Sequence, residues 1–403
     1  MFIAFIASLI VGLQAAPAAP TDIPQYALQR VSPRIWWFSF NVVIRELDVP
    51  NNDRPFRMPL ITNGPWSELG PHTLRVESLS GNKSNMVLNA NQALMGTGVQ
   101  GEQMVRMPVD VTAQNFAAID VSAEVVCWGS EVNEDAAASI PWPAQWPAGV
   151  AKALQPQVLI ESDEPIFKQT VDSIFGPNLR MTPPWIAAKR ITQYCCNNIT
   201  ISGNRLVGTR SNALRGLNVA GALATAQSGK GTRADLVCLS VAMLRAAGIP
   251  ARPVVGLSQV SGKSREPVAW AEFYLPRSGW VPFSPWEMQK AGVRTWKPDR
   301  EWRYFGNWKD LNLNIPLAWS FAPGDGTTAY DTWAIWGWTR AMPWAPFPAP
   351  VKVMTLPNRP ETMTRDYRPA AITLGMSSGS SISDRDLTQW REGERRPIRR
   401  PRP

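Results

Sequence analysis

The stretch that decides the fold runs from Gly231 to Arg252 and reads Gly-Thr-Arg-Ala-Asp-Leu-Val-Cys-Leu-Ser-Val-Ala-Met-Leu-Arg-Ala-Ala-Gly-Ile-Pro-Ala-Arg. Thr232 is a candidate N-cap, and Asp235 three positions later is typical of a capping box. Gly248 predicts the end of the helix, and Pro250 prevents the helix from resuming. A largely buried helix is also predicted by the apolar positions Leu236, Leu239, Val241, Met243 and Leu244.

Three strands are predicted after this helix. The apolar run 253–256 predicts the first strand, residues 268–275 predict the second, and residues 280–285 predict the third. A turn at Arg277-Ser-Gly279 separates the second strand from the third. The order is therefore one buried helix followed by three strands, which indicates an α+β domain.

The same residues carry a resemblance to a known family. The motifs are Leu244-Arg-Ala-Ala-Gly-Ile-Pro-Ala-Arg252, Ala269-Trp270 with Glu272, and Gly279-Trp280 followed by Pro285. They resemble the core of the transglutaminase-like superfamily, a branch of the papain-like cysteine-enzyme fold. The resemblance covers the middle third of the chain strongly and the flanks weakly, and it implies a papain-type α+β domain.

The three catalytic positions of that family hold other residues here. Family enzymes place a nucleophilic Cys two residues after the helix-initiating Gly, a His just before the Ala-Trp pair, and an Asp just before the final Pro. These positions are Arg233, Val268 and Ser284 in this chain. Cysteine chemistry needs a thiolate, an activating base and a group that orients the base. The resemblance therefore implies a degenerate, catalytically inactive member, or pseudoenzyme, without the Cys-His-Asp triad.

The only histidine of the chain, His72, lies in the N-terminal strand-rich region, so we expect it to lie outside the family site. Two interpretations remain open for Arg233: a side chain that swings into solvent, or a cation that binds an anion together with the N–H groups of Gly231 and Thr232. We expect the former substrate cleft, which would bind a peptide, protein or cell-wall polymer, to be formed by Gly231, Thr232, Arg233, Trp270 and Trp280.

Arg252 and Glu272 are predicted to form a structural charge pair within the core. The four cysteines are Cys127, Cys195, Cys196 and Cys238. An exported protein could join two of the set Cys195, Cys196 and Cys238 in a disulfide, and buried free thiols are the alternative. The vicinal pair Cys195-Cys196 has no metal-site spacing, and neither a metal nor a cofactor is predicted.

Composition and charge bound the remaining function classes. The chain has 403 residues, 44% of them hydrophobic, and a net charge of +9. Six Arg and two Glu in residues 391–403 account for +4 of that charge, so much of the basicity belongs to the tail. Basic residues do not alternate with aromatic residues as in nucleic-acid-binding helices. Residues 1–18 resemble a secretory signal with a small-residue cleavage site at Ala16-Pro-Ala18, and no other run is long enough to span a bilayer.

The pass along the chain predicts several successive segments. Short strands with regular turns predict a β-sandwich over residues 30–133, and residues 134–157 predict a rigid linker rich in Pro and Trp. The transglutaminase-like domain is predicted over residues 158–348, and its aromatic part 296–348 fits either a core or a stacking platform. A disordered basic Arg/Pro tail is predicted over 357–403, with a transient helix at 384–392 as the exception.

The functional prediction is an exported, catalytically inactive transglutaminase-like protein that acts as a binding or structural component of the cell envelope. One alternative is a hydrolase or acyltransferase with a rearranged active site that uses Asp235, Glu272 or Glu287. Another alternative is a subunit of a surface protein assembly, with the Trp/Pro-rich C-terminal part as its interface. The sequence leaves the ligand and the oligomeric state open.

Overall fold

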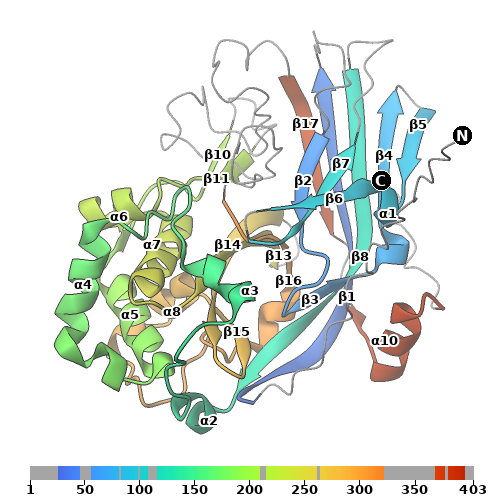
Figure 1. Ribbon diagram of the computed structural model, residues 1–403. Helices are drawn as coiled ribbons and strands as arrows, with labels where there is room; N and C mark the ends of the chain where they lie inside the picture. Colours follow the sequence, from blue (N-terminus) through green and yellow to red (C-terminus); the bar gives the residue numbers. More distant parts are fainter. Residues whose placement is uncertain are drawn as a thin grey trace, which may run out of the picture.

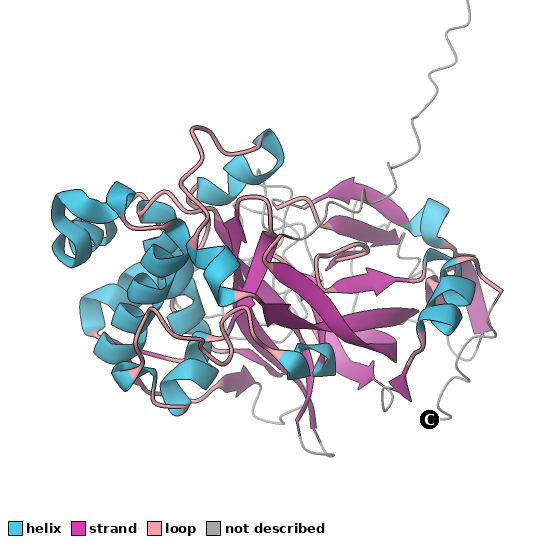
Figure 2. Cartoon of the chain, turned by 90° about the horizontal axis from the view of Figure 1, so that it is seen from below, coloured by secondary structure: helices cyan, strands magenta, loops and turns pink. Residues whose placement is uncertain are grey.

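The structure is a computed structural model that describes residues 26–45, 56–80, 83–98, 100–107, 116–208, 215–260, 264–321, 368–376 and 380–394. A strand-rich part is followed by a helix-rich part, and the chain then returns to the first part (Figure 1). Figure 2 shows most helices at one end of the molecule and most strands at the other. Within the described ranges, no helix has the length and apolar character needed to cross a bilayer.

A seven-stranded sheet forms the frame of the strand-rich part. Its main path has the order β17-β1-β8-β4-β5, while β18 pairs with β1 and β3 pairs with β8. Strands β1 and β8 are antiparallel from the pair Leu28↔Val132 to the pair Arg45↔Phe116. The strands are β1 (Leu28–Arg45), β3 (Ser67–Leu69), β4 (Arg75–Ser80), β5 (Lys83–Leu88), β8 (Phe116–Val132), β17 (Arg368–Met376) and β18 (Ser380–Ser381).

A smaller sheet completes the predicted sandwich. It has the order β2-β7-β6, with β2 at Phe56–Leu60, β7 at Gln103–Met107 and β6 at Leu94–Thr97. Buried side chains of both sheets, such as Phe38 and Val105, belong to one hydrophobic core. The short α1 (Ala90–Ala93) and the 3₁₀ helix η2 (Pro71–Thr73) connect strands within this part.

The predicted linker 134–157 packs against the helix-rich part. It contains α2 (Glu134–Ala138), α3 (Ala148–Ala151) and η3 (Lys152–Leu154). The indole of Trp142 donates to the carbonyl oxygen of Thr182 at 2.7 Å, and the indole of Trp146 donates to that of Gly248 at 3.0 Å. The Trp residues of this segment therefore serve as hydrogen-bonded anchors on the domain that follows.

Helices and a four-stranded antiparallel sheet form the second part, so the predicted α+β fold class is confirmed. The sheet order is β15-β14-β13-β16, with bounds Gly279–Phe283, Ser264–Leu275, Ala251–Val260 and Asn314–Ala318. Its α-helices are α4 (Pro165–Phe175), α5 (Pro184–Asn198), α6 (Ala222–Ser228), α7 (Arg233–Ala246) and α8 (Pro285–Lys290). Shorter elements are η4 (Gly176–Met181), η5 (Val293–Thr295), η6 (Lys309–Leu313), β9 (Thr200–Ile201), β10 (Leu206–Gly208), β11 (Arg215–Leu217) and β12 (Lys230–Gly231).

Helix α7 lies at the centre of this part, where the sequence predicts a buried helix. Its residues from Ala234 to Arg245 are buried, and it packs against α4, α5, α6, α8, β13 and β14. Gly248 follows it with a φ of 78°, a left-handed conformation that a side chain would strain. The helix therefore ends where the sequence predicts, and the chain turns directly into β13.

The predicted disordered tail is corrected for the two segments of residues 357–403 that the structure describes. Strand β17 pairs along β1, and residues 380–394 contain β18 and α10 (Asp384–Arg391). Trp390 is 1% exposed, and Ile382 and Leu387 are also buried. The polar composition of this segment predicts disorder because its few apolar residues meet partners that are distant in sequence.

Candidate functional site

The N-terminus of α7, where the family places its nucleophile, is closed by a carboxylate of the chain itself. Thr232 Oγ1 accepts a hydrogen bond from the Asp235 N–H at 3.3 Å, and Asp235 Oδ2 accepts one from the Thr232 N–H at 2.8 Å. Asp235 Oδ1 also accepts from the N–H groups of Ala220 and Gly221, at 2.6 and 3.0 Å. The anion site predicted at Gly231, Thr232 and Arg233 is therefore corrected at Thr232, since its N–H is already bonded to Asp235.

Arg233 occupies the first position of α7 and is half-buried. Its guanidinium carbon lies 4.0 Å from the centroid of the Trp286 ring, which is a cation–π distance. Arg205 lies close enough that its pKa is lowered, first by burial and then by the charge of Arg233. The side chain is thus held against an aromatic ring beside a second arginine.

Ser284 and Val268, at the other two triad positions, have structural roles. Ser284 is 4% exposed and caps α8, where its hydroxyl accepts from the Glu287 N–H at 3.3 Å. Its own N–H donates to the carbonyl oxygen of Tyr304 at 3.0 Å. Val268 lies opposite Gly256 in the β13–β14 pair and packs against the core. Because α7 packs against both β14 and α8, the fold brings together the three elements that carry these positions.

The structure brings Arg252 and Glu272 together as directly opposite residues of β13 and β14. Arg252 Nε donates to Glu272 Oε2 at 2.9 Å, and Nη2 lies 2.8 Å from the same oxygen. The guanidinium carbon lies 3.8 Å from the Trp280 ring centroid and 3.6 Å from that of Trp319. Burial raises the pKa of Glu272, while the charge and hydrogen bond of Arg252 oppose that shift.

Two tryptophans predicted to line the cleft belong to the surroundings of this buried pair. Trp280 stacks on Arg252, and its carbonyl oxygen accepts a hydrogen bond from the Trp66 indole at 3.0 Å. Trp270 is 2% exposed and packs edge-on against Trp308, with the ring centroids 6.3 Å apart. Both rings therefore pack in the interior, while Arg233 lies over Trp286.

All four cysteines lie in the described part of the chain and are buried free thiols. Burial raises the pKa of Cys195 to about 12 and also raises the pKa values of Cys127, Cys196 and Cys238. A thiol that stays protonated at neutral pH is a poor nucleophile. Of the two interpretations that the sequence leaves open, the structure contains the free thiols.

The remaining candidate groups have separate surroundings. Asp235 is bonded to three backbone N–H groups, Glu272 to Arg252, and Glu287 lies 3.9 Å from Lys290 in the first turns of α8. His72 packs edge-on against Trp390, with the ring centroids 6.0 Å apart. Among the described residues, no cluster of His, Cys, Asp and Glu is arranged to hold a metal ion.

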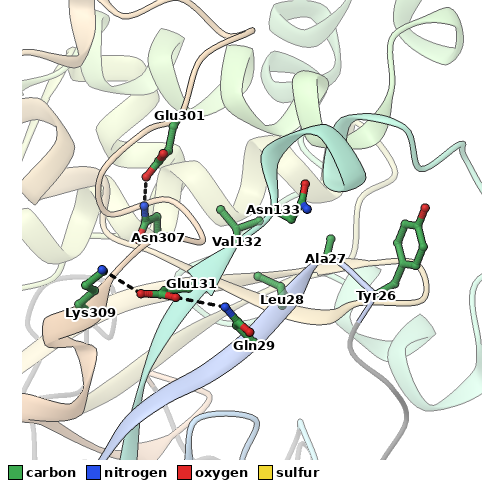
Figure 3. Close-up of a pocket in the computed structure, with 10 residues that line it drawn as sticks. All are labelled: Tyr26, Ala27, Leu28, Gln29, Glu131, Val132, Asn133, Glu301, Asn307 and Lys309. Carbon is green, nitrogen blue, oxygen red and sulfur yellow. Dashed lines mark hydrogen bonds and ion pairs between the residues drawn. The ribbon is translucent and has the colours of Figure 1, made fainter.

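The sequence analysis misses a polar pocket of about 590 Å³ beside the ends of β1 and β8 (Figure 3). Its polar side chains come from both parts of the chain: Tyr26, Gln29, Glu131, Asn133, Glu301, Asn307 and Lys309. Lys309 Nζ lies 2.9 Å from Glu131 Oε1, and Gln29 donates to Glu131 Oε2 at 3.1 Å. No local motif signals this pocket, since its members are spread along most of the described chain.

Comparisons with known proteins agree with this geometry. Residues 177–285 match the family model of the transglutaminase-like superfamily, so this part of the chain is a transglutaminase-like domain. The matched stretch ends at Pro285 and includes α7 and strands β13 to β15. A search of curated proteins finds no match.

Solved structures with a similar fold include two bacterial proteins. One is described as a "Putative Cysteine Protease" from Cytophaga hutchinsonii, with 13% identity, a TM-score of 0.48, and coverage of 88% of this chain and 94% of that chain. The other is the periplasmic domain of TgpA from Pseudomonas aeruginosa, with 15% identity, a TM-score of 0.31, and coverage of 64% of this chain and 91% of that chain.

Proposed function

We propose that this chain is a non-catalytic transglutaminase-like protein that is exported and acts as a binding or structural component of the cell envelope. The observation that carries the proposal is the state of the three triad positions. Arg233 stacks on Trp286, Ser284 caps α8, and Val268 packs in β14. None of these side chains supplies a thiolate, an imidazole or a carboxylate.

The rest of the chain supports the same proposal. The four thiols are buried and have raised pKa values, and the only histidine packs against Trp390. The rearranged-hydrolase alternative receives no support, because Asp235 and Glu272 are occupied by separate structural partners. The surface-assembly alternative is weakened for Trp302, Trp308 and Trp319, since their rings lie in the core of this chain. Trp333, Trp336, Trp338 and Trp344 lie outside the described residues.

Native thiol labelling tests the loss of cysteine chemistry. The purified protein is treated with iodoacetamide before and after unfolding in guanidinium chloride, and labels are counted by intact mass. We expect no label in the folded protein and four labels after unfolding, because buried, protonated thiols are unreactive. A folded-state thiol that reacts faster than an unfolded cysteine would overturn the proposal.

Reinstating the triad tests whether Arg233 marks the former nucleophile position. The variant Arg233→Cys places a thiol at the N-terminus of α7, where the helix dipole lowers a thiol pKa. We expect one label in folded Arg233→Cys, at a rate that rises further when Val268→His and Ser284→Asp are added. Arg233→Ala is the matched control and should take none. An unreactive residue at position 233 in all these folded variants would contradict the assignment.

Export rests on the sequence of residues 1–18, which lie outside the described residues. A fusion of residues 1–25 to alkaline phosphatase, an enzyme that is active only after export, tests it in a bacterial host. We expect phosphatase activity and a mature fusion shortened at its N-terminus. An inactive, full-length fusion in the cytoplasm would count against export, independently of the thiol results.

A further inference from the structure

We infer that the polar pocket of Figure 3 is a binding site for a neutral oligosaccharide, a site that goes beyond the proposed function and lies apart from the triad positions. The pocket of about 590 Å³ falls within the range of roughly 300–1,000 Å³ that small-molecule sites occupy. Arg233, Val268 and Ser284 are not among its lining residues.

The chemistry of the lining selects a polyhydroxylated ligand. Gln29, Asn133 and Asn307 present amides, while Glu131 and Glu301 present carboxylates. An amide both donates and accepts, and a carboxylate accepts, so together they match sugar hydroxyls, which do both. Most ligand pockets are lined by apolar side chains, and this polar lining is suited to a ligand rich in hydrogen-bonding groups.

The charges of the lining favour a neutral ligand. Lys309 and Glu131 form an ion pair at 2.9 Å, and this hydrogen bond lowers the pKa of Glu131. Glu301 accepts a hydrogen bond from the amide of Asn307. With two carboxylates and one ammonium, the pocket has no accumulation of positive charge that would attract a polyanion.

The polar groups are fixed before any ligand binds, which lowers the entropic cost of binding. Gln29, Glu131 and Lys309 form one chain of contacts, and Glu301 and Asn307 form another (Figure 3). The loop that carries Glu301, Asn307 and Lys309 contains Tyr304 with a φ of 65°, a strained conformation for an aromatic residue.

The surrounding structure holds this strained loop in place. The Tyr304 N–H donates to the Asn307 carbonyl at 2.9 Å, and the Gly306 N–H donates to that of Pro282 at 2.9 Å. The backbones of Trp308 and Ser130 exchange two hydrogen bonds, at 2.8 and 3.0 Å. Strain that the fold maintains in this way is concentrated at ligand sites in other proteins.

Two further features indicate a chain of sugar units. Tyr26 is 49% exposed at the pocket, and its ring is held by Arg277, whose guanidinium carbon lies 4.6 Å from the ring centroid. An exposed aromatic face suits the apolar face of a sugar ring. A second hollow of about 400 Å³ shares Glu301, Asn307 and Lys309 with the pocket and continues past Tyr304, which lengthens the surface available to an oligomer.

Isothermal titration calorimetry of the full chain with chitotetraose and cellotetraose tests the inference, and a neutral pentapeptide is the comparison ligand. We expect at least one of the two saccharides to bind with a dissociation constant of about 1 mM or tighter. Tyr26→Ala and Glu301→Gln should each weaken that binding by about tenfold or more, because each removes a contact but leaves the core unchanged.

Arg233→Ala is the control variant and should bind as the wild type does, and thermal unfolding of every variant verifies that it is folded. Binding of neither saccharide would overturn the inference. Saccharide binding that survives both pocket variants, or that is lost in folded Arg233→Ala, would also overturn it. Tighter binding of the pentapeptide through Tyr26 and Glu301 would replace the saccharide with a peptide and likewise overturn the inference.

Discussion

At the scale of single residues, the guanidinium of Arg252 lies between the rings of Trp280 and Trp319 and bonds to Glu272. Arg252 is 5% exposed and Glu272 is 2% exposed, so neither charge is solvated by bulk water. Burying two charges is costly, and each partner compensates the other only while both are present. The pair therefore makes the core sensitive to the loss of either side chain.

We expect Glu272→Ala to lower the free energy of unfolding by about 3–5 kcal/mol, because it leaves Arg252 buried without its carboxylate. Urea denaturation measures the change. The exposed pair Lys168–Asp172 supplies the control, since Lys168→Ala should cost less than about 1 kcal/mol. A Glu272→Ala protein that unfolds at the wild-type urea concentration would show that the pair contributes little.

A second carboxylate near Arg252 predicts a pH dependence. Burial raises the pKa of Glu102 above its ordinary value of 4.5, although Arg252 and backbone N–H groups oppose the shift. The folded protein therefore holds this proton more tightly than the unfolded chain. The stability from this group is complete below pH 4.5, and it is lost as the pH rises through the folded-state pKa.

Glu102→Gln removes this titration, so we expect the variant to gain stability relative to the wild type as the pH increases from 4.5 to 8. Urea denaturation at a series of pH values gives the difference. Glu68→Gln serves as the control, because Glu68 has an exposed ion pair with Arg391 and should show a smaller change. A wild-type advantage that grows with pH would contradict the prediction.

At the scale of elements, the caps of α7 and α8 show which parts of the sequence signal are reliable. Thr232, Asp235 and Gly248 predict where α7 begins and ends, and the structure places those boundaries there. Capping is a local interaction, so it can be read from neighbouring residues. The strand β13 is longer than the predicted run, because pairing with β14 and β16 extends it beyond the apolar residues.

We expect Thr232→Ala to destabilise the protein by about 1 kcal/mol, the usual cost of losing an N-cap hydroxyl. Asp235→Ala should cost more, because three backbone N–H groups would lose their acceptor. Chemical denaturation provides both values, and Ser383→Ala at the exposed cap of α10 is the control. An Asp235→Ala effect smaller than that of Thr232→Ala would refute this account of the cap.

At the scale of the whole molecule, the C-terminal segment attaches to the strand-rich part. The Trp390 indole donates to Glu124 Oε2 at 2.9 Å across 266 positions of sequence, and Arg391 makes a two-oxygen contact with Glu68. A Cβ atom on Gly70 would approach the Trp390 ring to 2.9 Å, so this glycine provides the space for the indole. The segment thus completes a core that begins some 350 residues earlier.

We expect Trp390→Ala to lower the free energy of unfolding by about 3–5 kcal/mol, the range for truncating a buried tryptophan. Arg391→Ala, whose side chain is partly exposed, should cost less than about 1 kcal/mol. Hydrogen exchange of β1 and β8 in Trp390→Ala locates the loss. Unchanged stability and exchange would indicate that α10 does not dock on the sheet in solution.

The sequence by itself determined the helix–strand order of the transglutaminase-like domain, the caps of α7, and the identity of the residues at the three triad positions. It also predicted the Arg252–Glu272 pair, since neighbouring antiparallel strands place these two residues opposite each other. These features depend on short-range periodicity, on turn chemistry and on motifs of a few residues, all of which are legible in a single chain.

Only the tertiary structure decided the docking of the C-terminal segment, the burial of the thiols and of Trp270, and the polar pocket. Tyr26, Glu131 and Glu301 reach one pocket from three distant segments, and Trp390 finds Glu124 in the same manner. Such contacts depend on how elements pack, and local composition carries no information about a partner hundreds of residues away. For this reason the emptied family site was visible in the sequence, while the pocket that we assign to a saccharide was not.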